Sequence, residues 1–266
     1  MQHNIGCVIL SNTDDLRFLQ PGLKEIVPIF KSIVVAMGSK LWNGTEENIE
    51  KMNFFIDDTK KKYNNIQYII YKIPEDKDNS MITYVSSEMY WEGHARYISL
   101  TDSIKACEYV VFLDSDEIID GEKFKAWLDT GIYKKYEALK LQNYWYWREP
   151  IYRAKNYFED SVVMMKNGSY DSRYLFSNMG RHGVFASCVG SRRRDVTSID
   201  DEPMIHHYSW VRNHYEMLRK VQSWGHRNDR LDWIAMVDEE FSRDFNGTDF
   251  LKHLEYDIVN NRFNIK

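Results

Sequence analysis

The first half of the chain alternates short apolar runs with longer stretches in which apolar residues recur every three or four positions. This pattern predicts strands at 5–10, 32–37, 66–73 and 109–113, and helices near 15–29, 46–63 and 84–106. Strands that alternate with helices at this spacing are typical of βα units joined by right-handed crossovers. We therefore expect a mainly parallel sheet.

The second half is richer in strand-like segments. A short helix is expected near 121–129, strands at Ala138–Trp147 and Ser161–Met165, and a return to helix from 211 to about 241. Because no helix separates the two strands, the sheet should be mixed, with antiparallel members. The expected fold class is α/β, with a mixed, mainly parallel central sheet flanked by helices. Without a linker or repeat, residues 1–210 should form the main domain and residues 211–266 a helical extension packed on it.

The most informative stretch of the chain is an apolar, strand-like run that is followed directly by three acidic side chains. Tyr109 to Leu113 are all apolar or aromatic, and Asp114, Asp116 and Glu117 follow within four positions. Such a run predicts a strand buried on both faces, and the carboxyl ends of parallel strands are where ligands bind in open α/β sheets. Carboxylates there suit Mg²⁺ or Mn²⁺ shared with a nucleotide diphosphate. The structural alternative is an acidic turn or helix cap.

Composition narrows the classes of partner. The net charge is −5, so nothing indicates a nucleic-acid surface, and the one dense basic run, Arg192 to Arg194, is typical of a solvated loop. Apolar windows are too short to cross a bilayer. Three widely spaced cysteines and no leader-like start predict a cytoplasmic, soluble protein. Aromatic residues make up 15%, which suits surfaces that stack on sugars, bases or proteins.

With these features, the chain resembles the GT-A fold glycosyltransferases, in particular the DxD-containing, family 2-like group of small bacterial and viral members. The resemblance spans Ile5 to Trp210 and rests on the run Phe112 to Ile118 (FLDSDEI). It is supported by His206 to Arg212 (HHYSWVR) and by Trp224 to His226. It implies a metal-dependent, inverting enzyme that moves a sugar from a nucleotide-sugar donor, UDP favoured, to a glycan or polysaccharide hydroxyl, with Mn²⁺ or Mg²⁺ as cofactor. The oligomeric state is not indicated.

The resemblance also assigns donor and metal residues. Asp114 would lie near the ribose or the metal, Asp116 would bind the metal, and His207 or His206 would complete the coordination. Other donor-binding positions are Ser11, Asn12, Thr13, Gly38, Ser39 and Arg96. The acidic residue that the family often has at the end of the second strand is missing from Ala36 to Gly38. Arg96 has an equally good alternative as a solvent-exposed helix residue.

Inversion needs a carboxylate base on the far side of the sugar from the diphosphate. The resemblance favours an acid from the second half, with Asp160 first, then Glu159, then Glu149. Acceptor-binding candidates are Trp145, Trp147, Arg181 and His182. For the tryptophans a buried core strand is the alternative, and for the histidine a purely structural role.

Two other functions remain open at the level of sequence. Phosphatases of the haloacid dehalogenase type also place Asp-x-Asp after a buried strand, with the first Asp as nucleophile, but on the first strand of their domain. A non-catalytic carbohydrate-binding protein would account for the aromatic content, although not for three carboxylates at a buried strand tip. Metal-dependent binding of a nucleotide sugar would separate both from a transferase.

Overall fold

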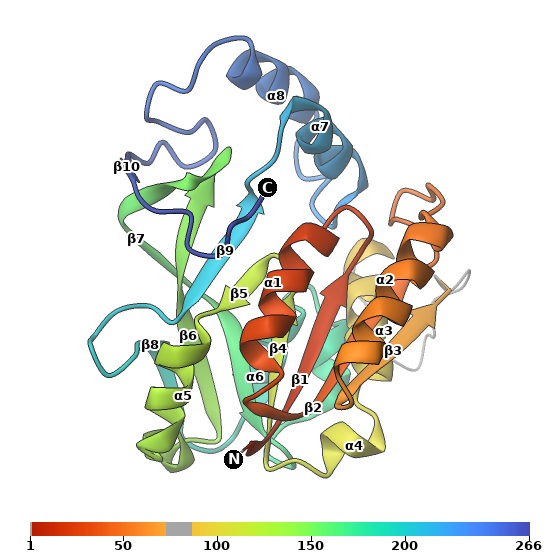
Figure 1. Cartoon of the computed structure of the whole chain (residues 1–266), viewed down its shortest axis with the longest axis vertical. Helices are drawn as coiled ribbons and strands as arrows, with labels where there is room; N and C mark the ends of the chain where they lie inside the picture. The colour runs from red at the N-terminus through yellow and green to blue at the C-terminus, as the bar shows by residue number, and fades with distance from the viewer. Residues whose placement is uncertain (1, 73–86) are drawn as a thin grey trace.

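The computed structural model describes residues 2–72 and 87–266. These residues form an α/β fold in which one mixed sheet has helices on both faces (Figure 1). The first-half elements are β1 His3–Ser11, α1 Leu16–Ile26, β2 Phe30–Gly38, α2 Ile49–Lys62, β3 Ile66–Tyr71, α3 Ser87–Ile98, α4 Asp102–Lys105 and β4 Tyr109–Asp114. The later elements are β5 Glu117–Ile119, α5 Gly121–Asp129, η1 Ile132–Lys135, β6 Ala138–Trp147, β7 Glu149–Lys166, η2 Ser172–Phe176, α6 Arg181–Ser187, β8 Arg192–Val196, β9 Ile205–Trp210, α7 His214–Ser223, α8 Trp233–Phe241 and β10 Tyr256–Ile258.

The sheet runs in the order β3-β2-β1-β4-β7-β6-β9-β5, with β10 beside β7 and β8 beside β6. The four strands of the first half pair in parallel, as do β6 with β8 and β6 with β9. Strand β7 is antiparallel to both β4 and β6, and β5 is antiparallel to β9. The predicted fold class, a mixed and mainly parallel sheet flanked by helices, is confirmed.

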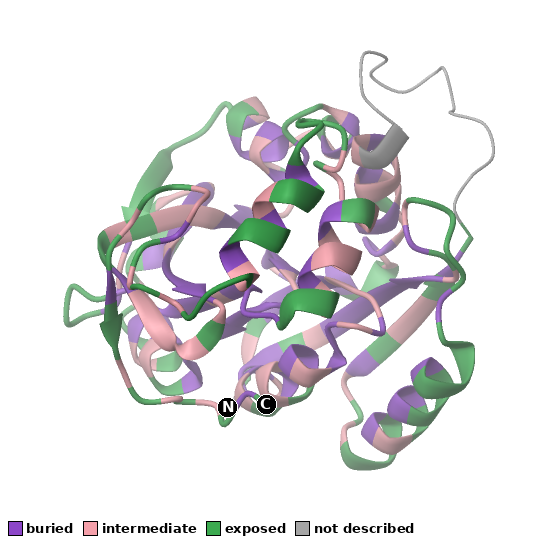
Figure 2. Ribbon diagram, turned by 90° about the horizontal axis from the view of Figure 1, so that it is seen from above, coloured by how far each residue is buried: buried purple, intermediate pink, exposed green. Residues whose placement is uncertain are grey.

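Strand β4 is buried on both faces, as its uninterrupted apolar sequence predicts. Tyr109, Val111 and Leu113 pack into a core with α1, α2 and α5, whereas Val110 and Phe112 pack on the opposite side with Ile104, Val184 and Phe185. Figure 2 shows this layering, with buried residues along the strands and exposed ones on the outward sides of the helices. This packing on both faces fixes the position of β4, a central strand whose carboxyl end lies beside the carboxyl end of β1.

Several predicted elements differ from the structure in extent. The helix expected at 84–106 is divided into α3 and α4, and its first residues, with the end of the strand expected at 66–73, fall outside the described residues. The strand expected at Ser161–Met165 is the end of β7, which begins at Glu149. Alternating charged and aromatic residues in its first half conceal the strand, because that half is only partly buried.

Residues 211–266 are not purely helical. The helical stretch expected from 211 to 241 is two helices, α7 and α8, separated by turns, and β10 adds a strand to the sheet through β7. A cluster that includes Trp147, Trp210 and Trp233 joins this region to the sheet. Helices α7 and α8 lie at the same end of the molecule as the carboxyl end of β1 (Figure 1). Among the described residues, no helix is long and apolar enough to cross a membrane.

Candidate active site

A cavity of about 430 Å³ opens where the carboxyl ends of β1, β2 and β4 face α7. Eight of the predicted site residues line it: Ser11, Asn12, Gly38, Asp114, Asp116, Trp145, Glu159 and His207. Strands that are far apart in the sequence therefore deliver these side chains to one place. This is the edge at which open α/β sheets bind ligands.

The third carboxylate of the acidic tip, Glu117, is a structural anchor. Its side chain is fully buried and receives two hydrogen bonds from the Arg181 guanidinium, at 2.6 and 2.5 Å. Glu117 also accepts hydrogen bonds from the Asp114 backbone N–H at 2.8 Å and from the Ser161 hydroxyl at 2.8 Å. Arg181, expected at the acceptor, lies outside the cavity lining and instead fixes the turn that presents the two aspartates.

Asp114 is paired with two arginines. Its Oδ1 lies 2.7 Å from Arg96 Nη2, and its Oδ2 lies 3.5 Å from Arg181 Nη2. Burial opposes ionisation of Asp114, but the two guanidinium groups outweigh it and lower the pKa of the carboxyl. Arg96 is 1% exposed. It does not line the cavity itself and acts there by orienting Asp114, so the alternative of a solvent-exposed helix arginine is wrong.

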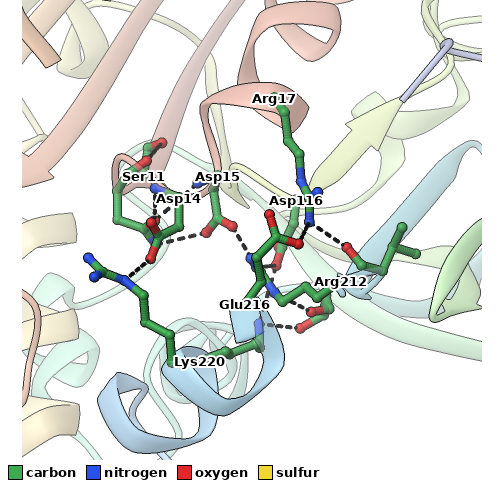
Figure 3. A network of polar contacts seen from close by, with 12 residues as sticks. Ser11, Asp14, Asp15, Arg17, Asp116, Arg212, Glu216 and Lys220 are labelled. Atoms are coloured by element: carbon green, nitrogen blue, oxygen red, sulfur yellow. Dashed lines mark hydrogen bonds and ion pairs between the residues drawn. The ribbon is translucent and has the colours of Figure 1, made fainter. Parts of the chain in front are cut away.

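Asp116 faces three cationic groups, and Figure 3 shows two of them, Arg212 and Lys220. Its Oδ2 lies 3.6 Å from Lys220 Nζ and 3.7 Å from Arg212 Nη2, while its Oδ1 lies 3.7 Å from His207 Nε2. Arg212 also binds Asp15 at 2.5 Å. Burial raises the pKa of Asp116, and the charges of Lys220 and His207 only partly oppose it. A buried cluster of this kind is a place where a phosphate could replace a carboxylate as partner of the cations.

The two neighbouring histidines of β9 point to opposite sides, because side chains alternate along a strand. His207 Nδ1 lies 2.8 Å from Glu159 Oε2, and its ring packs edge-on against Trp145. Burial would lower the pKa of His207, but the hydrogen bond and charge of Glu159 raise it to about 9. His206 instead lies in an aromatic cluster, with Nδ1 2.7 Å from the Tyr146 hydroxyl, and does not line the cavity.

Asp116 and His207 are the two side chains at this end of the cavity that could contribute ligands to a divalent cation, which would take its other ligands from phosphates and water. Within residues 2–72 and 87–266, no three His, Cys, Asp or Glu side chains converge as a complete metal site. His207 Nε2 and Asp116 Oδ1 do face each other, and Glu159 holds the other ring nitrogen, the outer contact that orients metal-binding histidines. Mg²⁺ is usually bound in this partial way, through one or two carboxylates together with substrate phosphates.

The loops after β1 and β2 supply the other side of the cavity. Ser11, Asn12 and Gly38 line it, whereas Thr13 is buried and Ser39 lies outside the lining. The backbone N–H and the hydroxyl of Thr13 both donate to Glu47. Ala36 to Gly38, at the end of β2, contain no acidic residue. Glu47, in the loop before α2, lines the cavity and places a carboxylate there.

The three candidate bases lie in different surroundings. Glu159 lines the cavity with His207 and Asp116. Asp160 faces a second cavity, where its Oδ2 accepts a hydrogen bond from Arg194 at 2.7 Å and its Oδ1 lies 3.7 Å from Lys140 Nζ. Glu149 is an exposed residue at the start of β7 and lines neither cavity. The structure therefore brings one of the three carboxylates to the acidic tip.

The acceptor candidates divide in the same way. Trp145 lines the cavity, donates to the Tyr256 hydroxyl at 3.1 Å and packs against Lys252. Trp147 is buried and stacks on Trp210, with ring centroids 5.2 Å apart. It is therefore a residue of a buried core strand, which was the alternative to acceptor binding. His182 lines the second cavity, and burial lowers its pKa to about 3.

Many cavity residues were not identified as site residues from the sequence. They include Asp14, Asp15, Trp42, Glu47, Arg212, Lys220 and Lys252. Lys220 directly follows Arg219 in α7, so nothing in the sequence distinguishes it from an ordinary helix lysine. Trp224, Gly225 and His226, part of the resemblance but without an assigned role, also line the cavity. A Cβ on Gly225 would lie 3.1 Å from the Trp42 ring, so the two loops pack closely.

No protein-family model and no curated protein matches the chain. Among solved structures, a mannosyltransferase, PcManGT from Pyrobaculum calidifontis, in complex with GDP-Man and Mn²⁺, is similar at a TM-score of 0.43 and 11% identity, over 84% of this chain and 62% of that one. An active-site mutant of LgtC is similar at a TM-score of 0.32 and 15% identity, over 68% of this chain and 61% of that one. The chain thus spans about three fifths of the length of both structures.

Proposed function

We propose that the protein is a nucleotide-sugar-dependent glycosyltransferase. The observation that carries the proposal is the meeting of Asp116, His207 and the cations Arg212 and Lys220 at one end of the cavity that Ser11, Asn12 and Gly38 also line. Such an end suits a diphosphate, which is anionic and shares divalent cations with carboxylates.

The nucleoside would lie toward the loops after β1 and β2. Trp42 and Tyr71 offer ring surfaces there, and Glu47 offers a carboxylate for the hydroxyls of a ribose. Burial raises the pKa of Glu47, opposed by hydrogen bonds from Thr13. We infer UDP as the nucleotide from the family resemblance, and GDP and dTDP are the competing choices.

A divalent cation, Mn²⁺ or Mg²⁺, would be held by Asp116 and by His207, which would release its Nε2 proton on binding the metal, with Asp114 beside it. When bound, it supplies Lewis-acid compensation for the charge of the leaving diphosphate. The chain's own residues add to this: Lys220 and Arg212 approach the same end of the cavity, and Glu117 with Arg181 keeps the acidic turn in place.

Glu159 is the proposed base for an inverting transfer. It is the candidate carboxylate that lines the cavity, and its Oε1 lies near Lys252 Nζ, at 3.7 Å. Burial opposes its ionisation, but His207 and Lys252 lower its pKa and keep it ionised at neutral pH. In the transfer, the acceptor oxygen attacks the anomeric carbon, its proton goes to Glu159, and the bond from that carbon to the diphosphate breaks.

The competing functions receive less support from the site. A phosphatase of the haloacid dehalogenase type would need Asp114 free to act as nucleophile, yet both of its oxygens are paired with arginines. A non-catalytic carbohydrate-binding protein does not account for Lys220 and Arg212 beside an acidic turn. We therefore retain the transferase as the proposed function.

A thermal-shift screen tests it with UDP, GDP, dTDP and CMP, each with Mn²⁺, with Mg²⁺ or with chelator. We expect one nucleotide to stabilise the protein, by about 2.7 kcal/mol at 100 times its dissociation constant. Asp116→Asn should remove the increment that depends on the metal, and exposed Asp257→Asn, on β10, is the matched control. No shift with any nucleotide would overturn the proposal.

A further inference from the structure

The sequence contains three Asn-Gly pairs, which begin at Asn43, Asn167 and Asn246, and none of these asparagines lines the cavity of the proposed active site. Such a pair can lose the asparagine amide without an enzyme, because glycine has no side chain to hinder its backbone nitrogen. That nitrogen attacks the asparagine Cγ, the bond from Cγ to Nδ2 breaks, and ammonia leaves with the proton of the glycine N–H. Water then opens the resulting succinimide ring at one of its two carbonyl groups, which gives aspartate or isoaspartate.

The fold holds Asn167 away from this reaction. Its Nδ2 donates to the carbonyl oxygens of Ile104 and Cys107, both at 2.9 Å, and its Oδ1 accepts from the Tyr170 hydroxyl at 3.3 Å. The amide would have to break these hydrogen bonds to turn toward the glycine nitrogen, and each broken bond costs free energy. The folded chain should therefore keep Asn167 intact.

Asn43 and Asn246 are a matched pair. Each begins an exposed Asn-Gly-Thr turn in which the threonine N–H donates to the asparagine Oδ1, at 3.0 and 3.1 Å respectively. The two glycines have nearly the same backbone conformation, with φ of 87° and 92°. They differ at the attacking atom. Gly44 N–H donates to the Leu41 carbonyl at 2.8 Å, whereas Gly247 N–H has no hydrogen-bond partner in the described part of the chain.

A hydrogen bond at the glycine N–H slows the attack, because the nitrogen must lose the proton that the acceptor carbonyl holds. The Gly247 nitrogen lacks this restraint, and the hydrogen bond from Thr248 polarises the Asn246 amide carbonyl that it attacks. We propose that Asn246 is a site of spontaneous deamidation, with water as the co-reactant, and that the fold protects Asn43 and Asn167 from the same reaction. This proposal does not depend on the transferase function.

The modified bond lies just before a turn that forms part of the cavity wall. Asp249 accepts hydrogen bonds from three backbone N–H groups within residues 251–254. Lys252, in this turn, lines the cavity, and its Nζ lies 3.7 Å from Glu159 Oε1. Isoaspartate at Asn246 adds a methylene group to the main chain, which aspartate does not. We therefore expect isoaspartate to loosen the turn that carries Lys252.

The test follows deamidation of the full chain by peptide mapping with mass spectrometry, during incubation in mildly alkaline buffer at body temperature. The chain is incubated both folded and in concentrated urea. The unfolded chain is the control for sequence, because Asn43 and Asn246 both follow an aromatic residue and precede Gly-Thr. Asn246→Gln is the control for the assignment of the signal, because the longer side chain does not close the same ring.

In urea, the sites at Asn43 and Asn246 should react within about twofold of each other. In the folded chain, we expect Asn246 to react about fivefold faster than Asn43, which is the factor that one hydrogen bond of ordinary net strength contributes. Asn167 should be the slowest of the three. Equal rates at Asn43 and Asn246 in the folded chain, or a faster reaction at Asn43, would overturn the proposal.

Hydrogen exchange tests the expected effect on the turn. Fresh protein, the fraction that contains isoaspartate and the variant Asn246→Asp are compared. We expect faster exchange around residues 249–256 in the isoaspartate fraction. Asn246→Asp should exchange like the fresh protein, since it carries the new charge without the added methylene group. Unchanged exchange in the isoaspartate fraction would overturn the link between this site and the turn that carries Lys252.

Discussion

Asp116 and Glu117 are neighbours in the acidic turn and both carry a carboxylate, but they lie in different surroundings. Asp116 faces the cavity, while Glu117 is buried against Arg181 and holds the turn in shape. The distinction follows from the geometry of a sharp turn between β4 and β5, which sends successive carboxylates in different directions. Sequence alone shows three acids and cannot show which of them is already paired.

Replacing Arg181 with Met should destabilise the fold strongly. Breaking a buried ion pair leaves an uncompensated charge, which costs about 3–5 kcal/mol. Equilibrium urea unfolding measures the loss. Arg173→Met is the control, because its pair with Asp171 is on the surface, where such pairs are worth about 0–1 kcal/mol. Equal losses in the two variants would contradict an anchoring role for Arg181.

Substitutions at 159 and 160 distinguish the two neighbouring carboxylates. Glu159→Gln should lower kcat by about 10²–10⁴, the usual contribution of a general base, with nucleotide affinity retained. Asp160→Asn should leave kcat close to the wild-type value, because Asp160 does not line the cavity that holds Asp116 and His207. Steady-state kinetics with varied acceptor separates the effects. A larger loss of kcat in Asp160→Asn would return the role of base to Asp160, the first choice from the sequence.

We expect the titration of His206 to lower the free energy of unfolding as the pH falls below 6.5. Burial, with the charges of Arg262 and Arg153, lowers its pKa to about 3, against 6.5 for an ordinary histidine. The folded state therefore disfavours protonation, so its contribution to stability is complete above pH 6.5 and is lost as the pH falls toward 3. Between pH 7 and pH 5 the loss is about 2 kcal/mol from this group.

Urea unfolding of the wild type and of His206→Gln at both pH values tests this dependence. The glutamine variant should lose about 2 kcal/mol less between pH 7 and pH 5, whatever its stability at pH 7. Because the carboxylates are the same in both proteins, their titration cancels in the comparison. Identical pH dependence would show that His206 is protonated as easily in the folded state as in the unfolded one.

At the scale of elements, local patterns predicted much of the sheet but only part of the second half. The first four strands, α5 and β6 follow directly from apolar runs and period, and the bounds of β6 are those expected from the sequence. The first half of β7, the short strand β5 and β8 were missed, because their residues are charged or few and their pairing partners are distant. Likewise His206 and His207 could not be told apart before the register of β9 was known.

Helix α7 illustrates how a local signal positions a site residue. Asn213 and Glu216 form a capping box, in which each side chain accepts a hydrogen bond from the other's backbone N–H at 3.0 Å. The cap fixes where the helix begins and so sets the direction of Lys220, two turns later. Asn213→Ala should cost about 1 kcal/mol in urea unfolding, and Asn213→Asp should restore most of it. Equal losses in both variants would contradict the capping role.

At the scale of the whole molecule, segments that are far apart in the sequence meet at the cavity, among them the turn after β1 and helix α7. The turn after β1 contacts the region of α7 through Asp15 with Arg212 and Asp14 with Arg219, at 2.5 and 2.6 Å. Pairs so distant in sequence leave no local pattern, which is why the basic side of the site was not predicted. The family resemblance pointed to Arg212 and Trp224 only as parts of longer motifs.

Ligand binding should therefore slow hydrogen exchange both in the turn after β1 and in α7. Hydrogen exchange measured by mass spectrometry, with and without the nucleotide and Mn²⁺, should show slower exchange in peptides around 11–15 and in α7, because a diphosphate at Asp116 also reaches Lys220 and Arg212. Helix α5 borders neither cavity and should be unchanged. Protection confined to the loops after β1 and β2 would mean that α7 takes no part in donor binding, and the cations would then serve only to balance Asp15 and Asp116.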